Sequence, residues 1–215
     1  MEIKYLVYVI NFLELIAVII AIISFDKYKN SNEKFFLYFL CYSFLIDILG
    51  AVVGDLLLKN NAWVYNTFII TSFLFYFSWY YNILKKSIFK KWVLVFSVLF
   101  ILVAVYNLFL GSWATYNSMT FFVGALSLLV LTLFHFYQLL NSNEVLFVKY
   151  KLSFWISTGL LLFYMGMIPL MYLMEMEYTG INYLSYIIIL LSLNVVLYGC
   201  YTIGFIWTKK NYNIF

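Results

Sequence analysis

Apolar residues in this chain fall into seven long stretches that are separated by short polar breaks. The stretches cover residues 5–25, 35–58, 62–84, 92–110, 116–140, 152–174 and 181–208. Each is long enough for a helix that crosses a hydrocarbon core of about 30 Å, allowing some tilt. The pattern therefore predicts an all-α fold, a polytopic membrane bundle of seven transmembrane helices that forms a single domain over residues 1–215.

Positive charge is distributed unevenly over the polar breaks. Eleven of the 13 basic residues, all of them lysines, lie in alternate breaks and in the C-terminal tail: Lys27, Lys29, Lys34, Lys85, Lys86, Lys90, Lys91, Lys149, Lys151, Lys209 and Lys210. Only Lys4 and Lys59 fall on the other side. Loops that stay in the cytoplasm are enriched in Lys and Arg. The charge pattern therefore predicts that the N-terminus lies outside and the C-terminus inside.

Tryptophan positions agree with these limits, because the indole ring favours the membrane interface. Trp63 and Trp113 fall at predicted outer ends, and Trp92, Trp155 and Trp207 at predicted inner ends. Trp79 lies deeper in the third stretch and is the exception.

Composition excludes an ordinary soluble domain and narrows the partners. The chain is 66% hydrophobic and only 10% charged, whereas soluble domains average about 25% charged residues. The net charge is +4, and the lysines that cause it are spread over several short loops. We interpret them as determinants of membrane topology and expect no direct binding of nucleic acid. Cys41 and Cys200 lie in apolar stretches without a CxxC pair or clustered histidines. We therefore expect no metal site and no cofactor.

Three polar residues lie where the membrane disfavours them. Glu14, Asp47 and Asn194 fall inside the first, second and seventh stretches. A charged side chain at the bilayer centre costs about 2.5 to 3.5 kcal/mol on insertion scales, which makes it a candidate for function. Helical rise places the three roughly 12 to 20 Å below the outer surface, in one polar layer, so the first, second and seventh helices are expected to meet around it. They are the candidate ligand or proton site, and hydrogen bonding between helices is the alternative role.

Helical spacing gives Asp47 a direction. Gly50, Ala51 and Gly54 follow it at i+3, i+4 and i+7, so the four residues share one stripe of the helix. Small residues let helices approach closely, which predicts that this stripe faces a neighbouring helix.

Tyrosines and the single histidine are further polar residues of the apolar stretches. Tyrosine hydroxyls are expected to hydrogen-bond to the buried carboxyl groups, with Tyr65, Tyr164 and Tyr198 as candidates. His135, the only histidine, is expected to be a hydrogen-bonded packing residue or, alternatively, a pH switch.

The sequence lacks the motifs of a retinal protein and of the common catalytic and phosphate-binding sites. The seventh stretch has no lysine before Lys209, at the membrane edge, to form a retinal Schiff base. No Ser/His/Asp or Cys/His set and no phosphate-binding glycine loop is recognisable. We therefore assign no catalytic residue and do not expect an enzyme.

The run Phe-Trp-Ile-Ser-Thr-Gly-Leu-Leu-Leu-Phe-Tyr-Met-Gly at 154–166 resembles a segment of uncharacterised small seven-span inner-membrane proteins of Bacteroidetes. Asp-Ile-Leu-Gly at 47–50 and Tyr-Thr-Ile-Gly-Phe at 201–205 are similar to further segments of these proteins. The resemblance implies a multi-pass protein of the bacterial inner membrane, in a group with some members encoded near signalling kinases. A second, vaguer resemblance is to membrane accessory proteins of RNA-targeting CRISPR systems.

Together these observations predict a non-enzymatic membrane protein that acts as a sensor, signalling or accessory subunit. Its connections are too short for a folded domain, so the expected output is a separately encoded cytoplasmic protein. A transporter or an oligomeric pore is the main alternative. The partners that the sequence allows also include further copies of the chain, in a homo-oligomer. Further alternatives are an antiviral CRISPR-associated accessory protein and an intramembrane lipid hydrolase with Glu14 and Asp47 as its carboxylate pair.

Overall fold

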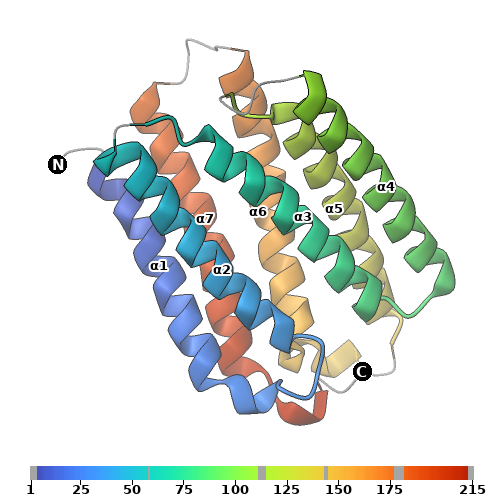
Figure 1. Ribbon diagram of the computed structural model, residues 1–215. Coiled ribbons are helices and arrows are strands. Elements are labelled where there is room, and N and C mark those ends of the chain that lie inside the picture. Colours follow the sequence, from blue (N-terminus) through green and yellow to red (C-terminus); the bar gives the residue numbers. More distant parts are fainter. Residues whose placement is uncertain (1–3, 58, 111–114, 143–144, 177–181, 213–215) are drawn as a thin grey trace. The chain divides into compact units, whose positions relative to one another are not determined.

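The computed structural model describes residues 4–57, 59–110, 115–142, 145–176 and 182–212. Within these ranges the regular structure is entirely helical, which confirms the all-α prediction. The α-helices are α1 (Lys4–Ile23), α2 (Lys34–Ala51), α3 (Ala62–Ile83), α4 (Ser87–Leu110), α5 (Ser118–Leu140), α6 (Leu152–Glu175) and α7 (Tyr183–Trp207), as Figure 1 shows. Short 3-10 helices cover Phe25–Lys27, Val145–Tyr150 and Lys210–Tyr212, and a π-helical turn, Val52–Leu56, follows α2.

Five of these helices are long and apolar enough to cross a membrane. They are the segments Lys34–Gly54, Ser87–Phe109, Ser118–Leu140, Leu152–Glu175 and Tyr183–Trp207. This is the pattern of a multi-pass membrane protein.

The start of α4 differs clearly from the sequence prediction. The helix begins at Ser87, whereas the apolar stretch begins at residue 92, so Lys90 and Lys91 are helical. Lys91 is exposed and Lys90 partly exposed. A lysine can lay its apolar stem along a helix and keep its ammonium in water, so charge does not stop a helix where the apolar run ends.

The tryptophans mostly follow the interface prediction. Trp63, Trp92 and Trp207 are each almost half exposed, as expected for rings at a membrane boundary. Trp79 is buried and packs edge-on against Tyr80, with ring centroids 5.0 Å apart. Its deep position is therefore explained by packing inside the protein. Trp113 lies outside the described residues.

The residues group into two compact units. Unit 1 comprises Met1–Leu40 and Leu139–Phe215, and unit 2 comprises Cys41–Gln138. Unit 1 thus joins α1, the start of α2, α6 and α7, which come from the two ends of the chain.

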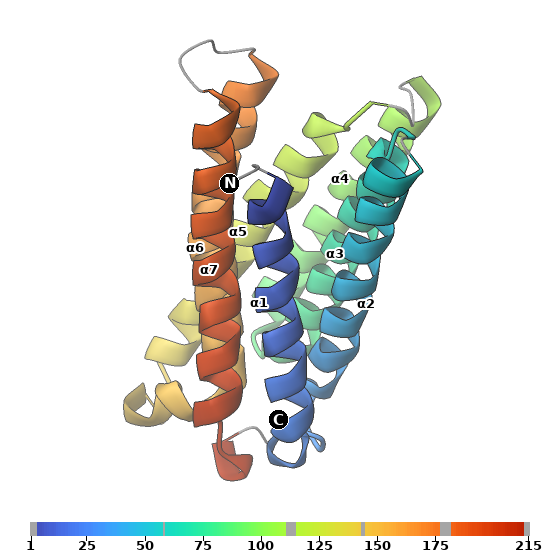
Figure 2. The ribbon, with the colours of Figure 1, turned by 90° about the vertical axis from the view of Figure 1, so that its left-hand side faces the viewer.

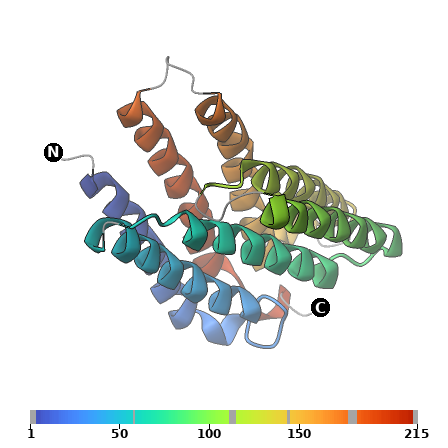
Figure 3. The ribbon, with the colours of Figure 1, turned by 45° about the horizontal axis from the view of Figure 1, so that its top comes forward.

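In unit 1, α7 lies between α1 and α6 and packs against both (Figures 1 and 3). Figure 2 shows α1 and α7 side by side and running in the same direction. Glycines allow α6 and α7 to approach closely: a Cβ on Gly204 would lie 2.6 Å from Cβ of Trp155, and one on Gly159 would lie 3.2 Å from the Leu197 carbonyl oxygen. Small residues at such contacts increase van der Waals packing between membrane helices.

Unit 2 has an aromatic interior centred on α3. Phe73 and Phe77 of α3 each contact the ring of Phe100 of α4, at 5.4 Å and 5.5 Å between centroids. Aromatic pairs of this kind add about 0.5 to 1.5 kcal/mol each beyond burial of their area. Packing of large rings therefore joins α3 to α4 in this unit.

Amide side chains join α3 to the α5 region at both ends. Near its start, buried Asn66 donates from Nδ2 to the Thr115 carbonyl at 2.8 Å and accepts from the Asn117 amide at 3.0 Å. Near its end, Gln138 donates to the Ile83 carbonyl at 3.1 Å and accepts from the Lys85 amide at 2.6 Å. These bonds occupy backbone groups that the helix ends would otherwise leave unsatisfied.

Candidate functional site

Glu14 forms a buried contact between α1 and α7. Its side chain is fully buried, and its Oε1 accepts a hydrogen bond of 2.7 Å from the Tyr198 hydroxyl. Both residues lie nine positions before the end of their helices, at Ile23 and Trp207, or about 14 Å along each axis. Because α1 and α7 run in the same direction, this equal spacing brings the two side chains to one level.

This contact confirms two expectations about Glu14. The first and seventh helices do meet around its side chain, and a tyrosine hydroxyl from the candidate set does bind its carboxyl group. Of the other two candidates, Tyr164 is buried on α6, and Tyr65 belongs to unit 2. A ligand or proton role for Glu14 stays a prediction.

Asn194 extends the polar stripe of α7. It lies one helical turn before Tyr198 on the buried face of the helix, which also carries Ile187, Leu197, Tyr201, Gly204 and Phe205. Its Nδ2 donates to the carbonyl of Leu190 in the same helix, at 2.8 Å. The Oδ1 atom is the remaining acceptor of this amide. Asn194 thus adds a second buried polar group to α7, one turn from the Tyr198 that binds Glu14.

Asp47 belongs to unit 2, on the partly buried side of α2. The glycines of its stripe face the start of α3: a Cβ on Gly50 would lie 2.7 Å from the Tyr65 hydroxyl, and one on Gly54 would lie 2.6 Å from Nδ2 of Asn61. Asn61 also donates to the Gly50 carbonyl at 3.1 Å. The prediction that this stripe faces a neighbouring helix is therefore confirmed for its two glycines. The grouping of Asp47 with Glu14 stays a prediction.

His135 is fully buried within the aromatic interior of unit 2. Its ring lies 6.2 Å from that of Tyr80 and 6.5 Å from that of Trp79. One turn earlier, Thr132 shares a hydrogen bond of 2.9 Å with the Tyr80 hydroxyl. These surroundings are those of a packed histidine, and the pH-switch role stays a prediction.

The same two helices that meet at Glu14 are tied together again at their ends. Lys27, just after α1, donates from Nζ to the carbonyls of Phe205 and Ile206 in α7, at 3.3 Å and 2.8 Å. A lysine at a helix C-terminus satisfies its last carbonyls and complements the negative end of the helix dipole. The Tyr28 ring packs on Phe205, with centroids 5.3 Å apart.

Glu33 is a second buried carboxyl group of unit 1, and it lies outside the apolar spans. The side chain is fully buried directly before α2, and burial raises its pKa to about 7. The positive charge of buried Lys151 opposes this rise. Ser31 and the backbone amide of Glu33 also favour the charged form, although neither reaches hydrogen-bond geometry with the carboxyl oxygens.

The C-terminal residues close this end of unit 1. The carbonyl oxygen of Tyr150 accepts from the Lys209 amide at 3.2 Å and from the Thr208 hydroxyl at 3.3 Å. Nζ of Lys209 lies 4.0 Å from the centre of the Tyr150 ring. The residues after α7 are therefore attached to the segment before α6. Lys151 directly follows Tyr150 in that segment, and Glu33 directly precedes α2.

Neither Lys27 nor Glu33 was singled out from the sequence. Both sit in a polar break with Asp26, Lys29 and Lys34, where a solvated loop is the ordinary expectation. Only the fold shows that this break covers the ends of α1 and α7. Among the described residues, no group of three His, Cys, Asp or Glu side chains is placed to hold a metal ion.

Comparisons with protein-family models, curated proteins and solved structures found no match for this chain. Its function is therefore argued from the residues and geometry described above.

Proposed function

We propose that the chain is a seven-span membrane protein, with its N-terminus outside and its C-terminus inside, that works as a sensor or accessory subunit for a separate cytoplasmic protein. The contact between Glu14 and Tyr198 is the sensing point. The joined ends of α1 and α7 are the output. We place the protein in a bacterial inner membrane, following the resemblance of residues 154–166.

The seven-span count extends the five strongly apolar helices by α1 and α3. With 20 and 22 residues, they measure about 30 and 33 Å, enough to cross the hydrocarbon core. Polar and amphipathic residues lower the hydropathy of α3. Several of these residues, among them Asn66, Ser72 and Trp79, are buried inside the protein. A span whose polar side chains face protein is tolerated in a membrane.

The single observation that carries the sensing role is the hydrogen bond of 2.7 Å between Glu14 and Tyr198. It joins residues 184 positions apart, and the buried residues of α1 near Glu14 include the small side chains of Ala17 and Ala21. Protonation of the carboxyl group, or a ligand that binds it, changes the bond at the centre of this contact. Ionisable residues within membranes mark proton and ligand sites by default.

The output role follows from the second connection between the same helices. Lys27 holds the last carbonyls of α7, and Tyr150 holds Thr208 and Lys209 beyond it. A change in the α1–α7 contact at Glu14 is therefore transmitted to the basic C-terminal tail. That tail is the part offered to a cytoplasmic partner.

The test uses the proton as the ligand and follows the output directly. Spin labels replace the exposed residues Ile22 of α1 and Ile206 of α7, in a chain with Cys41 and Cys200 changed to serine. The Glu33→Gln substitution removes the other buried carboxyl. We expect the dipolar coupling between the labels to change between pH 5 and pH 8, and Glu14→Gln to abolish that change.

The matched control is Glu175→Gln, which removes an exposed carboxyl group of α6 and should leave the pH response intact. A pH response that survives Glu14→Gln would assign Glu14 to helix packing alone. Reporter fusions test the topology separately: one between Lys85 and Lys91 should lie in the cytoplasm, and one in the connection between α4 and α5 outside. Reversed signals would overturn the orientation.

A further inference from the structure

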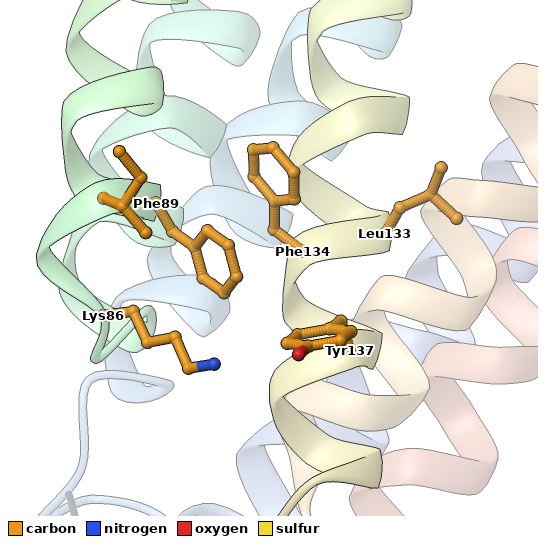
Figure 4. Close-up of a pocket in the computed structure, with 6 residues that line it drawn as sticks. Lys86, Phe89, Leu133, Phe134 and Tyr137 are labelled. Atoms are coloured by element: carbon orange, nitrogen blue, oxygen red, sulfur yellow. The ribbon is translucent and has the colours of Figure 1, made fainter.

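The surface of unit 2 has a groove between α4 and α5, at the end of these helices that carries the lysines. Figure 4 shows Lys86 and Phe89 on one side and Leu133, Phe134 and Tyr137 on the other, and Ile88 also lines the groove. Its volume is about 490 Å³, within the range of about 300 to 1,000 Å³ that is usual for ligand sites.

Three of the residues that line the groove are packed aromatic rings. The rings of Phe89 and Phe134 stack with centroids 4.7 Å apart and planes 8° apart, and Tyr137 packs edge-on against Phe89 at 6.0 Å. Ile88 and Leu133, on its rim, are each more than half exposed. Because both helices have the length and hydropathy of membrane spans, these apolar side chains face the hydrocarbon chains of lipids.

The ammonium group of Lys86 lies at one end of the groove. Nζ of Lys86 lies 4.7 Å from the centre of the Tyr137 ring and 5.5 Å from that of Phe89, so cation–π attraction holds the ammonium there. Lys85 directly precedes Lys86, and Lys90 and Lys91 lie in the first residues of α4. The chain contains no acidic residue between Asp55 and Glu144, so no carboxylate nearby in the sequence neutralises this cluster.

These features fit one class of occupant. An apolar groove open to the bilayer accepts an acyl chain, and a cluster of lysines at the level of the headgroups attracts a phosphate. A zwitterionic lipid carries its own cation, which the lysines repel. A soluble phosphate has nothing to place in the groove.

We propose that the groove between α4 and α5 is a binding site for one anionic phospholipid, whose phosphate contacts Lys86 and whose acyl chain lies across Phe89, Leu133 and Phe134. With the orientation proposed above, this lipid belongs to the cytoplasmic leaflet, where anionic lipids supply a negative surface potential. The site lies wholly in unit 2 and does not involve Glu14.

The experiment is native mass spectrometry of the purified full-length protein in detergent, titrated with phosphatidylglycerol, phosphatidylcholine or inorganic phosphate. We expect one phosphatidylglycerol to be retained in preference to phosphatidylcholine, and inorganic phosphate not to compete. Lys86→Gln should weaken its retention about fivefold, because a lysine near the membrane surface contributes about 1 kcal/mol to binding of anionic lipid.

Two further variants separate a built site from general surface charge. Leu133→Trp fills the groove without changing charge and should weaken retention of phosphatidylglycerol. Lys149→Gln removes the same charge from unit 1 and should leave it unchanged. Equal weakening by Lys86→Gln and Lys149→Gln, equal retention of both lipids, or normal retention by Leu133→Trp would each overturn the proposal.

Discussion

Units 1 and 2 contain the same kinds of residue but bury different ones. Among the described side chains, the fully buried carboxyl groups, Glu14 and Glu33, and the buried lysine, Lys151, all belong to unit 1. The buried polar residues of unit 2 are neutral amides and hydroxyls together with His135. A buried charge is costly unless its surroundings compensate it, so unit 1 carries the fully buried carboxyl groups whose protonation would remove such a charge.

The hydrogen bonds differ in the same way. In unit 1, Glu14–Tyr198 and Lys27–Ile206 join helices from opposite ends of the chain. In unit 2, Asn66 and Gln138 fix the connections around α3 and α5. Our proposals follow this contrast: they assign the response to protonation to unit 1 and the lipid-facing groove to unit 2. The predictions below test that division, from the largest expected effect to the smallest.

Glu33 should give unit 1 a pH-dependent stability. Its pKa is higher in the folded protein, about 7, than the ordinary 4.5, so the folded state binds the proton more tightly. Stability should therefore be greatest below pH 4.5, fall as the pH rises to about 7 and then level off, by about 3 kcal/mol in total.

Thermal unfolding in detergent at pH 5 and pH 8 measures this loss. Glu33→Gln should remove the slope and stabilise the protein at pH 8, while the exposed carboxyl variant Glu175→Gln should keep the slope. An unchanged slope in Glu33→Gln would contradict the assignment.

Gly204→Ala should loosen the contact between α6 and α7. The added methyl group would lie 2.6 Å from Cβ of Trp155, an atom fixed to the backbone, so the helices must separate at a cost of about 1 to 3 kcal/mol. Gly199 has nothing within 4 Å of its added Cβ, so Gly199→Ala should be neutral or stabilising by up to about 1 kcal/mol. Unfolding of the two variants in SDS titrations compares them, and equal destabilisation would show that this close approach is not required.

Asn66→Leu tests unit 2 in a comparable way. The substitution removes two hydrogen bonds, to Thr115 and from Asn117, and exposed Thr115 can bond to water instead, so we expect a loss of about 1 kcal/mol. Asn82→Leu, at an exposed position of the same helix, should change stability by no more than about 0.5 kcal/mol. The spin-label response of unit 1 should be unaffected by Asn66→Leu, and a lost response would break the division of roles.

Control variants aside, Lys27→Met should produce the smallest change in stability. Loss of a cation from the end of α7 removes about 0.3 to 1 kcal/mol, measured by thermal unfolding. Lys29→Met removes the exposed ion pair with Asp26 and should cost less, because surface pairs contribute little. A greater loss in Lys29→Met would show that Lys27 does not hold α7.

The positions of most helices were predictable, because a membrane helix is recognised almost entirely from the hydropathy and length of an apolar stretch. The ends of α5, at Ser118 and Leu140, and of α6, at Leu152 and Glu175, differ from the predicted stretches by two residues or fewer. The start of α4 was missed because apolarity, not helicity, was the signal. The π-helical turn after α2 has no comparable pattern in the sequence.

The candidate site was predictable only where one residue is anomalous by itself. Glu14 stands out because it lies in an apolar helix, and tyrosines were its expected partners. Glu33 is ordinary in a polar loop, and its burial depends on how the loop, α6 and α7 come together. Which helices contact one another is a long-range property that neither hydropathy nor charge pattern contains.

The central claim is that the contact between Glu14 and Tyr198 controls the ends of α1 and α7. A double-mutant cycle tests it most directly, with Glu14→Gln and Tyr198→Phe read by the dipolar coupling between labels at positions 22 and 206 at one fixed pH. We predict that each single substitution changes the coupling and that the double variant changes it no further, because both remove the same contact. Single variants that keep the wild-type coupling, or changes that add in the double variant, would contradict the claim.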